Sequence, residues 1–156
     1  MKKILLSIVL LTSFITGCST LPSPQEMKAE VQNFELPALP KEGEGMIYVV
    51  RPSVLGTLIR FNVFLDNQED SSEVGFTRGS QYIYFPVKPG THTIYSKAEN
   101  WADITVNVEP GDIYFIQQEP AMGFIMARNS IYELPDYEGK YQVKKLSVGT
   151  LLSASK

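Results

Sequence analysis

Short strand-like segments follow one another along the chain from Met46 onwards. Residues 46–52 form a β-branched and aromatic run that Pro52 ends, and residues 60–66 carry apolar side chains at alternate positions. Five further segments have the same character: VGFTRG, SQYIYFPV, THTIYSKA, ADITVNV and DIYFIQQE. Turns with proline and glycine, such as KPG and EPG, separate several of them. Short strands at intervals of about 8–12 residues, with no helical period between them, predict an all-β fold, an antiparallel β-sandwich of about 7–8 strands.

Two apolar segments leave two interpretations open. The stretch SVLGTLIR after the first strand is favoured as a β-bulge or crossover, and otherwise forms an exposed loop around Gly56 that meets a partner. In the stretch EPAMGFIMARNS, Met122, Phe124 and Met126 alternate, which favours an eighth strand with these side chains in the core. If they are exposed instead, they form an adaptable apolar patch of the kind found at binding surfaces. The candidate partner surface is therefore Gly56, Met122 and Phe124.

The C-terminal part of the chain predicts one short helix. Residues from Asp136 to about Leu146 end in two lysines, where the helix dipole favours positive charge. Gly139 lies within this stretch and weakens the helical pattern. We assign residues 46–148 to the β-sandwich domain and residues 149–156 to a C-terminal tail.

The N-terminus has the pattern of a secretory signal peptide. Lys2 and Lys3 precede an apolar run over residues 4–15, and the small residues Thr16 and Gly17 follow. A transmembrane helix needs about 20 apolar residues, so this run is too short to cross a bilayer. We expect residues 1–17 to be removed.

The only cysteine of the chain, Cys18, comes directly after this segment. It has no partner for an intrachain disulfide, and the sequence ITGC resembles the bacterial lipobox. The resemblance implies cleavage between Gly17 and Cys18, a diacylglyceryl group on the thiol and an acylated amine. Two or more acyl chains anchor a protein stably. By the same resemblance, Ser19 after the cysteine favours the outer membrane, with the domain facing the periplasm.

A proline-rich segment joins the predicted anchor to the domain. Residues 18–45 contain four prolines after the cysteine and end in KEGEG. Prolines favour extended, semi-rigid conformations, so we expect a tether. The stretch PQEMKAEVQNF is the one part that allows a helical turn or two, which is the less favoured interpretation.

The charge of the chain excludes one class of function. The full sequence has a net charge of −3, and without residues 1–17 it keeps 12 basic against 17 acidic residues, a net charge of −5. No basic cluster remains in the sequence, so nucleic-acid binding is not expected. The length suits one domain, whose stability must come from packing of its aromatic residues, since no disulfide is available.

The sequence lacks the motifs and residue spacings that are typical of catalytic and metal-binding sites. His92 is the only histidine and is expected to cap or pack a turn, so zinc or copper ligation is not expected. Asp66, Glu69, Asp70 and Glu73 lack the spacing of a calcium-binding EF-hand and are expected to form a solvated acidic loop. No GxSxG nucleophile motif is present. We predict no cofactor, no metal and no enzymatic activity.

Several motifs resemble known families of small β domains. The pieces IYVVRPS, VFLDN, YIYFPVKPGTHTI, VEPGDIYFI and MGF, in this order between Met46 and about Val148, resemble the bacterial family of domains of unknown function numbered 2846. The hairpin and turn–strand pattern is also similar to PEGA-type and transthyretin-like sandwiches. The first hairpin departs from the family, because DNQEDSSE is longer than the usual tight turn. The resemblance implies a fold and an envelope location. The family has no established activity, so the resemblance leaves the function of this chain open.

Two classes of function remain after these observations. The favoured one is a lipid-anchored, non-catalytic binding or structural module on the outer membrane, with another envelope protein or a glycan as partner. The alternative is a carrier of a small ligand, or an enzyme, with a pocket in the sandwich. A carrier requires an enclosed apolar cavity of at least about 300 Å³.

Overall fold

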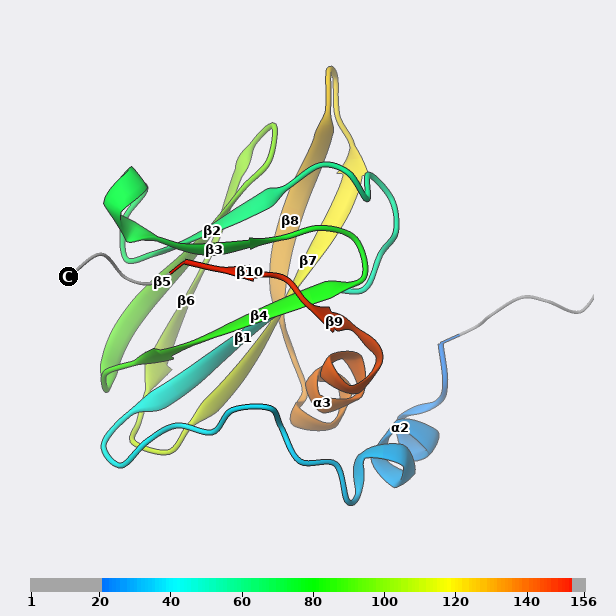
Figure 1. Cartoon of the computed structure of the whole chain (residues 1–156), viewed down its shortest axis with the longest axis vertical. Coiled ribbons are helices and arrows are strands. Elements are labelled where there is room, and N and C mark those ends of the chain that lie inside the picture. Colours follow the sequence, from blue (N-terminus) through cyan, green and yellow to red (C-terminus); the bar gives the residue numbers. More distant parts are fainter. Residues whose placement is uncertain (1–20, 153–156) are drawn as a thin grey trace, which may run out of the picture.

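The computed structural model describes residues 21–152, so the predicted signal peptide, Gly17 and Cys18 lie outside the described residues. Within residues 21–152 the chain forms two five-stranded β-sheets (Figure 1). The first sheet has the order β8 (Ala127–Leu134), β7 (Ile113–Met122), β1 (Gly45–Arg51), β4 (Gln81–Val87) and β9 (Ser147–Val148). The second has the order β10 (Thr150–Leu151), β3 (Glu73–Thr77), β2 (Phe61–Leu65), β5 (Gly90–Lys97) and β6 (Trp101–Val108). The helices are α2 (Pro24–Val31), α3 (Asp136–Lys145) and the short 3-10 helix η1 (Asp70–Ser72).

The prediction of a mostly β fold is confirmed, with three differences in detail. The described residues form ten strands rather than 7–8, because β9 and β10 have two residues each and leave no alternating pattern in the sequence. Two pairs are parallel, β1 with β7 and β4 with β9, so the sheets are not purely antiparallel. The eighth strand covers Ala127–Leu134, and the stretch 123–126 that was expected to continue a strand is the connection before it.

The core lies between the two sheets. Ile47 and Val49 of β1 face Val63 of β2 and Ile94 of β5 in one buried cluster, together with side chains from β4, β6 and β7. Since side chains alternate along a strand, Tyr48 on β1 points to the opposite face of its sheet. There it joins a second buried cluster that includes residues of α3 and of the N-terminal segment. All seven residues of β1 are buried for this reason, because the strand is covered on both faces.

Helix α3 confirms the helix predicted at the C-terminal part of the chain. It covers the first sheet and packs on β7. Gly139, the residue that weakens the helical pattern in the sequence, lies directly against the ring of Phe115 on β7, and a Cβ atom at this position would overlap that ring. The glycine therefore allows the helix to approach the sheet closely.

The N-terminal segment differs from the extended tether that its prolines predict. Ser23 and Glu26 form a capping box that begins α2, and Pro24 occupies a position where its missing N–H is harmless. Met27 and Val31, four residues apart, are buried in the contact with α3. Further along, the Tyr48 hydroxyl donates to the Ala38 carbonyl oxygen at 2.6 Å. Residues 21–44 thus pack on the domain from α2 onwards.

The residues after α3 also return to the domain. Strand β9 pairs with β4 of the first sheet, and β10 pairs with β3 of the second. The segment assigned to the C-terminal tail, residues 149–156, is therefore paired at its start, since Thr150 lies opposite Phe76 in the sheet.

Candidate interaction surface at the loop end

Several connections meet at one end of the two sheets. They are residues 52–60 between β1 and β2, residues 98–100 between β5 and β6, and residues 123–126 between β7 and β8. In Figure 1 the β5–β6 and β7–β8 connections project at the top and residues 52–60 lie beside them at the upper right. We call this part of the molecule the loop end.

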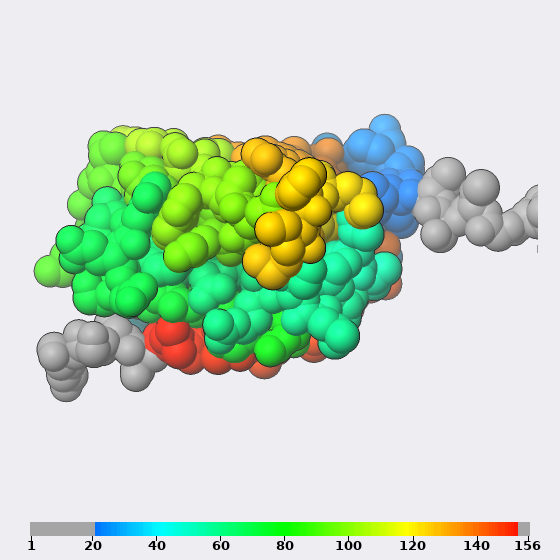
Figure 2. All heavy atoms as spheres, turned by 90° about the horizontal axis from the view of Figure 1, so that it is seen from above, coloured from blue at the N-terminus to red at the C-terminus, as the bar shows by residue number. Residues whose placement is uncertain are grey.

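Large apolar side chains are exposed on the loop end. The exposed fraction reaches 95% for Phe124 and 87% for Leu58. The set, which we call the apolar loop surface, comprises Val54, Leu55, Leu58, Met122, Phe124, Ile125 and Met126. Figure 2 shows the two contributing connections next to one another, residues 52–60 in teal and the β7–β8 hairpin in yellow and orange. Groups of exposed apolar side chains are typical of contact surfaces.

The structure decides between the two interpretations of each apolar segment. The prediction that Met122, Phe124 and Met126 lie in the core is wrong, because β7 ends at Met122 and the hairpin turn carries the others into solvent. Residues 52–60 do cross from the first sheet to the second, as favoured, and Val54, Leu55 and Leu58 among them are also exposed. Gly56, Met122 and Phe124 line one open hollow of about 330 Å³, so the three candidate residues come together.

Arg51 holds the connection 52–60 from inside. Its side chain is fully buried, and its guanidinium donates to the carbonyl oxygens of Ile59 at 2.8 Å and of Leu55 and Gly56 at 2.9 Å. The same group lies 3.7 Å from the centroid of the Phe61 ring. Burial lowers the pKa of Arg51 to about 10, so it remains charged at neutral pH. Three carbonyl groups thus turn towards one buried cation, and this fixes the course of the loop.

Glu99 holds the hairpin at residues 123–126 in the same way, with opposite charge. Its carboxylate accepts hydrogen bonds from the backbone N–H groups of Met126 at 2.7 Å, and of Phe124 and Ile125 at 3.0 Å. The bonds from Met126, Ile125 and Phe124 lower the pKa of Glu99. Gly123 precedes them, and a Cβ atom there would overlap the Met126 carbonyl oxygen and the Glu99 carboxylate. The apolar tip is therefore preorganised.

A pair of asparagines ties the base of this hairpin to the neighbouring connection. The Asn129 N–H donates to Asn100 Oδ1 at 2.8 Å, and Asn100 Nδ2 donates to the Asn129 carbonyl oxygen at 2.9 Å. Below them, the buried Gln118 donates to Ser96 Oγ at 2.8 Å. Polar bonds thus link β5, β7 and β8 just beneath the exposed tip.

Positive charge gathers beside the apolar loop surface. All four arginines of the sequence lie at this end: Arg51 inside, Arg60 and Arg78 both over the Phe76 ring, and Arg128 as the second residue of β8. An open hollow of about 540 Å³ is lined by Leu58, Ile59, Arg60, Asn62, Arg78, Lys97, Ala98 and Met126. Its lining contains basic and neutral side chains and no acidic one, and we call it the cationic hollow.

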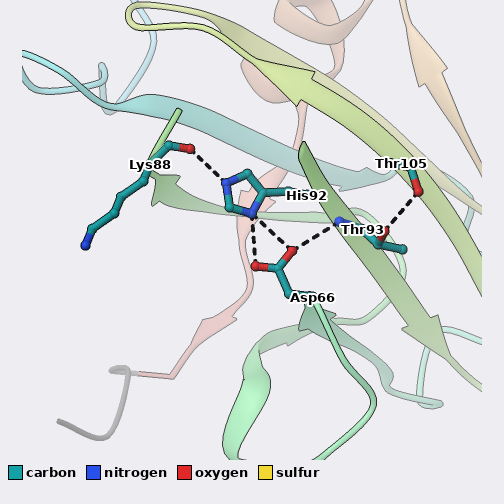
Figure 3. Close-up of polar contacts among 5 residues, drawn as sticks. All are labelled: Asp66, Lys88, His92, Thr93 and Thr105. Atoms are coloured by element: carbon teal, nitrogen blue, oxygen red, sulfur yellow. Dashed lines mark hydrogen bonds and ion pairs between the residues drawn. The ribbon is translucent and has the colours of Figure 1, made fainter. Parts of the chain in front are cut away.

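His92 makes structural contacts at a distance from the loop end (Figure 3). Its Nδ1 lies 2.9 Å from the Asp66 carboxylate, and its Nε2 lies 2.8 Å from the Lys88 carbonyl oxygen. The Thr93 N–H donates to the same carboxylate at 3.2 Å, and Thr93 and Thr105 share a bond between hydroxyls of 2.9 Å. Asp66 has a positive φ of 67°, so these bonds hold a turn that its backbone alone would not favour.

The part of the chain that the structure describes contains no group of three or more histidine, cysteine or acidic residues arranged to hold a metal ion. Glu73 of the predicted acidic loop instead accepts a hydrogen bond from Asn62 Nδ2 at 2.6 Å. Among residues 21–152, no helix has both the length and the apolar character needed to span a bilayer.

Comparison with known proteins places the domain in a family. Residues 41–130 match the family model described as "Protein of unknown function (DUF2846)". The chain belongs to the DUF2846 family. A protein of Haemophilus influenzae, described as "Uncharacterized protein", is 24% identical over 144 residues, which cover 91% of this chain and 82% of that protein. The family resemblance is confirmed, and the similarity to PEGA-type and transthyretin-like domains stays a prediction.

The DUF2846 match extends from residue 41 to residue 130 and so includes the whole loop end. Sequence reasoning missed Arg51 and Glu99, the two charges that hold it. For Arg51 a signal existed, because a cation at the end of an otherwise apolar strand needs buried acceptors. For Glu99 there was none, since a glutamate in a turn is usually solvated and its three partners lie 25–27 residues further along the chain.

Proposed function

We propose that this DUF2846 protein is a lipid-anchored, non-catalytic module of the bacterial cell envelope that acts by binding through its loop end. In this proposal residues 1–17 are removed, Cys18 carries the lipid, and the β-sandwich domain faces the periplasm from the outer membrane. The basic, apolar and small-residue order before Cys18 supports the anchor.

The apolar loop surface is the observation that carries the binding role. Exposed apolar area is unfavourable in water by about 25 cal/mol per Å², and a contact that covers it recovers this free energy. Arg51 and Glu99 order both connections before any partner arrives. Each side chain makes three hydrogen bonds of 2.7–3.0 Å, Arg51 to carbonyl oxygens and Glu99 to backbone N–H groups. Less conformational entropy is then lost on binding than with flexible loops.

The packing of α2 supports a short distance between the anchor and the domain. Leu21 is the first described residue, and only two residues separate it from Cys18. Three residue steps span at most about 10 Å. A lipid on Cys18 would therefore hold the domain close to the bilayer, and not at the end of a long tether.

The carrier or enzyme alternative finds less support. The hollows of about 330 and 540 Å³ have a sufficient size, but both are open at the molecular surface. Between the sheets, side chains from β1, β2, β4 and β5 fill the core.

Mass spectrometry of the protein purified from membranes tests the anchor. We expect a mature chain that begins at Cys18 with the mass of two or three acyl chains added, and a Cys18→Ser variant that stays unmodified. A wild-type chain that keeps residues 1–17, or has a free thiol at Cys18, would contradict the proposal.

Site-specific photo-crosslinking in whole cells tests the binding role. A photoreactive amino acid in place of Phe124 is expected to give crosslinked products, while the same group in place of Glu109, in an exposed turn between β6 and β7, serves as the matched control. Equal yields at the two positions would argue against a contact at the loop end.

A further inference from the structure

The arrangement of the loop end matches one kind of partner better than others. Its apolar side chains lie on projecting connections, with Phe124 95%, Leu58 87% and Ile125 84% exposed. Protein segments that lie in a membrane interface place large apolar side chains about 5–10 Å into the boundary between headgroups and acyl chains, with lysine and arginine beside them. A projecting apolar tip with a cationic border has this chemistry.

The charge around the tip points to an anionic surface. The chain as a whole is acidic, with a net charge of −3, yet Arg60, Arg78, Lys97 and Arg128 lie around the apolar loop surface. Glu99, in the connection between β5 and β6, directs its carboxylate to three backbone N–H groups of the hairpin tip. Arginine also suits phosphate better than lysine does, because its planar guanidinium donates two parallel hydrogen bonds.

We propose that the loop end docks on an anionic phospholipid bilayer, with Leu58, Phe124 and Ile125 in the interface and the cationic hollow on lipid phosphates. This inference deepens the proposed function, on which it rests for the presence of a bilayer beside the domain. It names the lipid surface itself as the component that the loop end contacts.

The position of α2 limits how one bilayer can meet both contacts. Figure 1 shows the projecting hairpins of the loop end at the top and α2 at the lower right, on the side where residues 52–60 also lie. A lipid on Cys18 would be within about 10 Å of the start of the described chain. In this proposal the domain therefore turns the side with residues 52–60 towards the membrane.

Binding of the unlipidated chain to vesicles tests this inference separately from the anchor. A chain of residues 19–156 contains every residue of the described fold and lacks Cys18. Its sedimentation with phosphatidylcholine vesicles is compared with that on vesicles containing phosphatidylglycerol. We expect binding to the anionic vesicles only, weakened by added salt. Circular dichroism and thermal unfolding of every variant show whether it is folded.

Two pairs of variants separate the contribution of the apolar side chains to vesicle binding from that of the cationic side chains. The double variant Phe124→Ser, Ile125→Ser is expected to weaken binding to the anionic vesicles at least about tenfold. Leu39→Ser is the matched control, because Leu39 is 65% exposed but lies outside the loop end, and it is expected to have no effect. Arg60→Gln with Arg78→Gln is expected to weaken it by about fivefold per cation. The matched change of Lys41 and Lys88 to glutamine, at the other end, is expected to leave it unchanged.

Two results would overturn the inference. The first is a folded chain 19–156 that sediments with neither kind of vesicle, in which case a protein partner takes the loop end. The second is an equal loss of binding in the Lys41 and Lys88 variant, which would mean general charge attraction. In either case, detection of a lipid on Cys18 by mass spectrometry would still support the proposed anchor.

Discussion

Replacing Arg51 by methionine removes the buried cation that holds residues 52–60. Its three hydrogen bonds to carbonyl oxygens and its contact with the Phe61 ring together contribute about 7 kcal/mol. Burial of the charge opposes this, since the lowering of the pKa of Arg51 to about 10 corresponds to about 3 kcal/mol. We therefore expect Arg51→Met to lower the free energy of unfolding by about 4 kcal/mol.

Urea unfolding of the chain 19–156, followed by the fluorescence of Trp101, measures this loss. Arg60→Met is the matched control, because Arg60 is exposed and makes one contact with the Phe76 ring, so its loss should stay below about 0.5 kcal/mol. Arg51→Lys keeps the charge without the forked donors and should lose about half as much as the methionine variant. Hydrogen exchange of the Ile59 N–H, which donates to the Gly56 carbonyl oxygen at 2.9 Å, reports on the loop itself.

The reasoning fails if Arg51→Met unfolds within about 0.5 kcal/mol of the wild type. It also fails if the stability falls but exchange of the Ile59 N–H stays as slow as before. The first result would mean that the desolvation cost cancels the contacts, and the second that other residues hold the loop.

Three further predictions concern the loop end, the aromatic cluster and the histidine. Glu99→Gln should accelerate hydrogen exchange of the Phe124, Ile125 and Met126 N–H groups, measured by mass spectrometry, and leave the rest of the domain unchanged; unchanged exchange at the hairpin would contradict its role. Burial raises the pKa of Tyr48 to about 12, so its contribution to stability is complete below about pH 10 and is lost as the pH rises through 12. Tyr48→Phe should therefore flatten the fall in unfolding free energy between about pH 10 and 12, and an equally steep fall would refute this. His92→Ala should lower the free energy of unfolding by about 1 kcal/mol and leave vesicle binding unchanged, whereas loss of binding in a stable variant would reverse the structural assignment.

The first seven strands were predictable from the sequence because a half-buried strand shows an alternating pattern and proline or glycine marks many of its ends. The same pattern misled at Met122, Phe124 and Met126. Three alternating apolar residues fit a core strand as well as an exposed hairpin, and only the position of the turn decides between them. That position depends on Glu99, which is distant in the sequence and gathers the backbone N–H groups of the tip.

Pairing between distant segments was not predictable either. The parallel contact of β1 with β7 joins residues that lie more than 60 positions apart, and no local pattern specifies it. The helix α2 was underestimated because its prolines suggested an extended chain, while its capping box and the buried pair Met27 and Val31 determine the structure. The candidate surface was identified in part, since Gly56, Met122 and Phe124 do lie together, but the charges that shape it were not.

Side-chain oxidation in the native envelope tests most directly whether the loop end is covered. Hydroxyl radicals are generated in intact envelopes and, separately, around the purified protein, and the oxidation of Met122, Phe124 and Met126 is compared by mass spectrometry. Leu39, exposed outside the loop end, is the internal reference. We predict strong protection of the three residues in the envelope and none at Leu39. Equal oxidation of the three residues in both samples would contradict the central claim that this surface is where the protein binds.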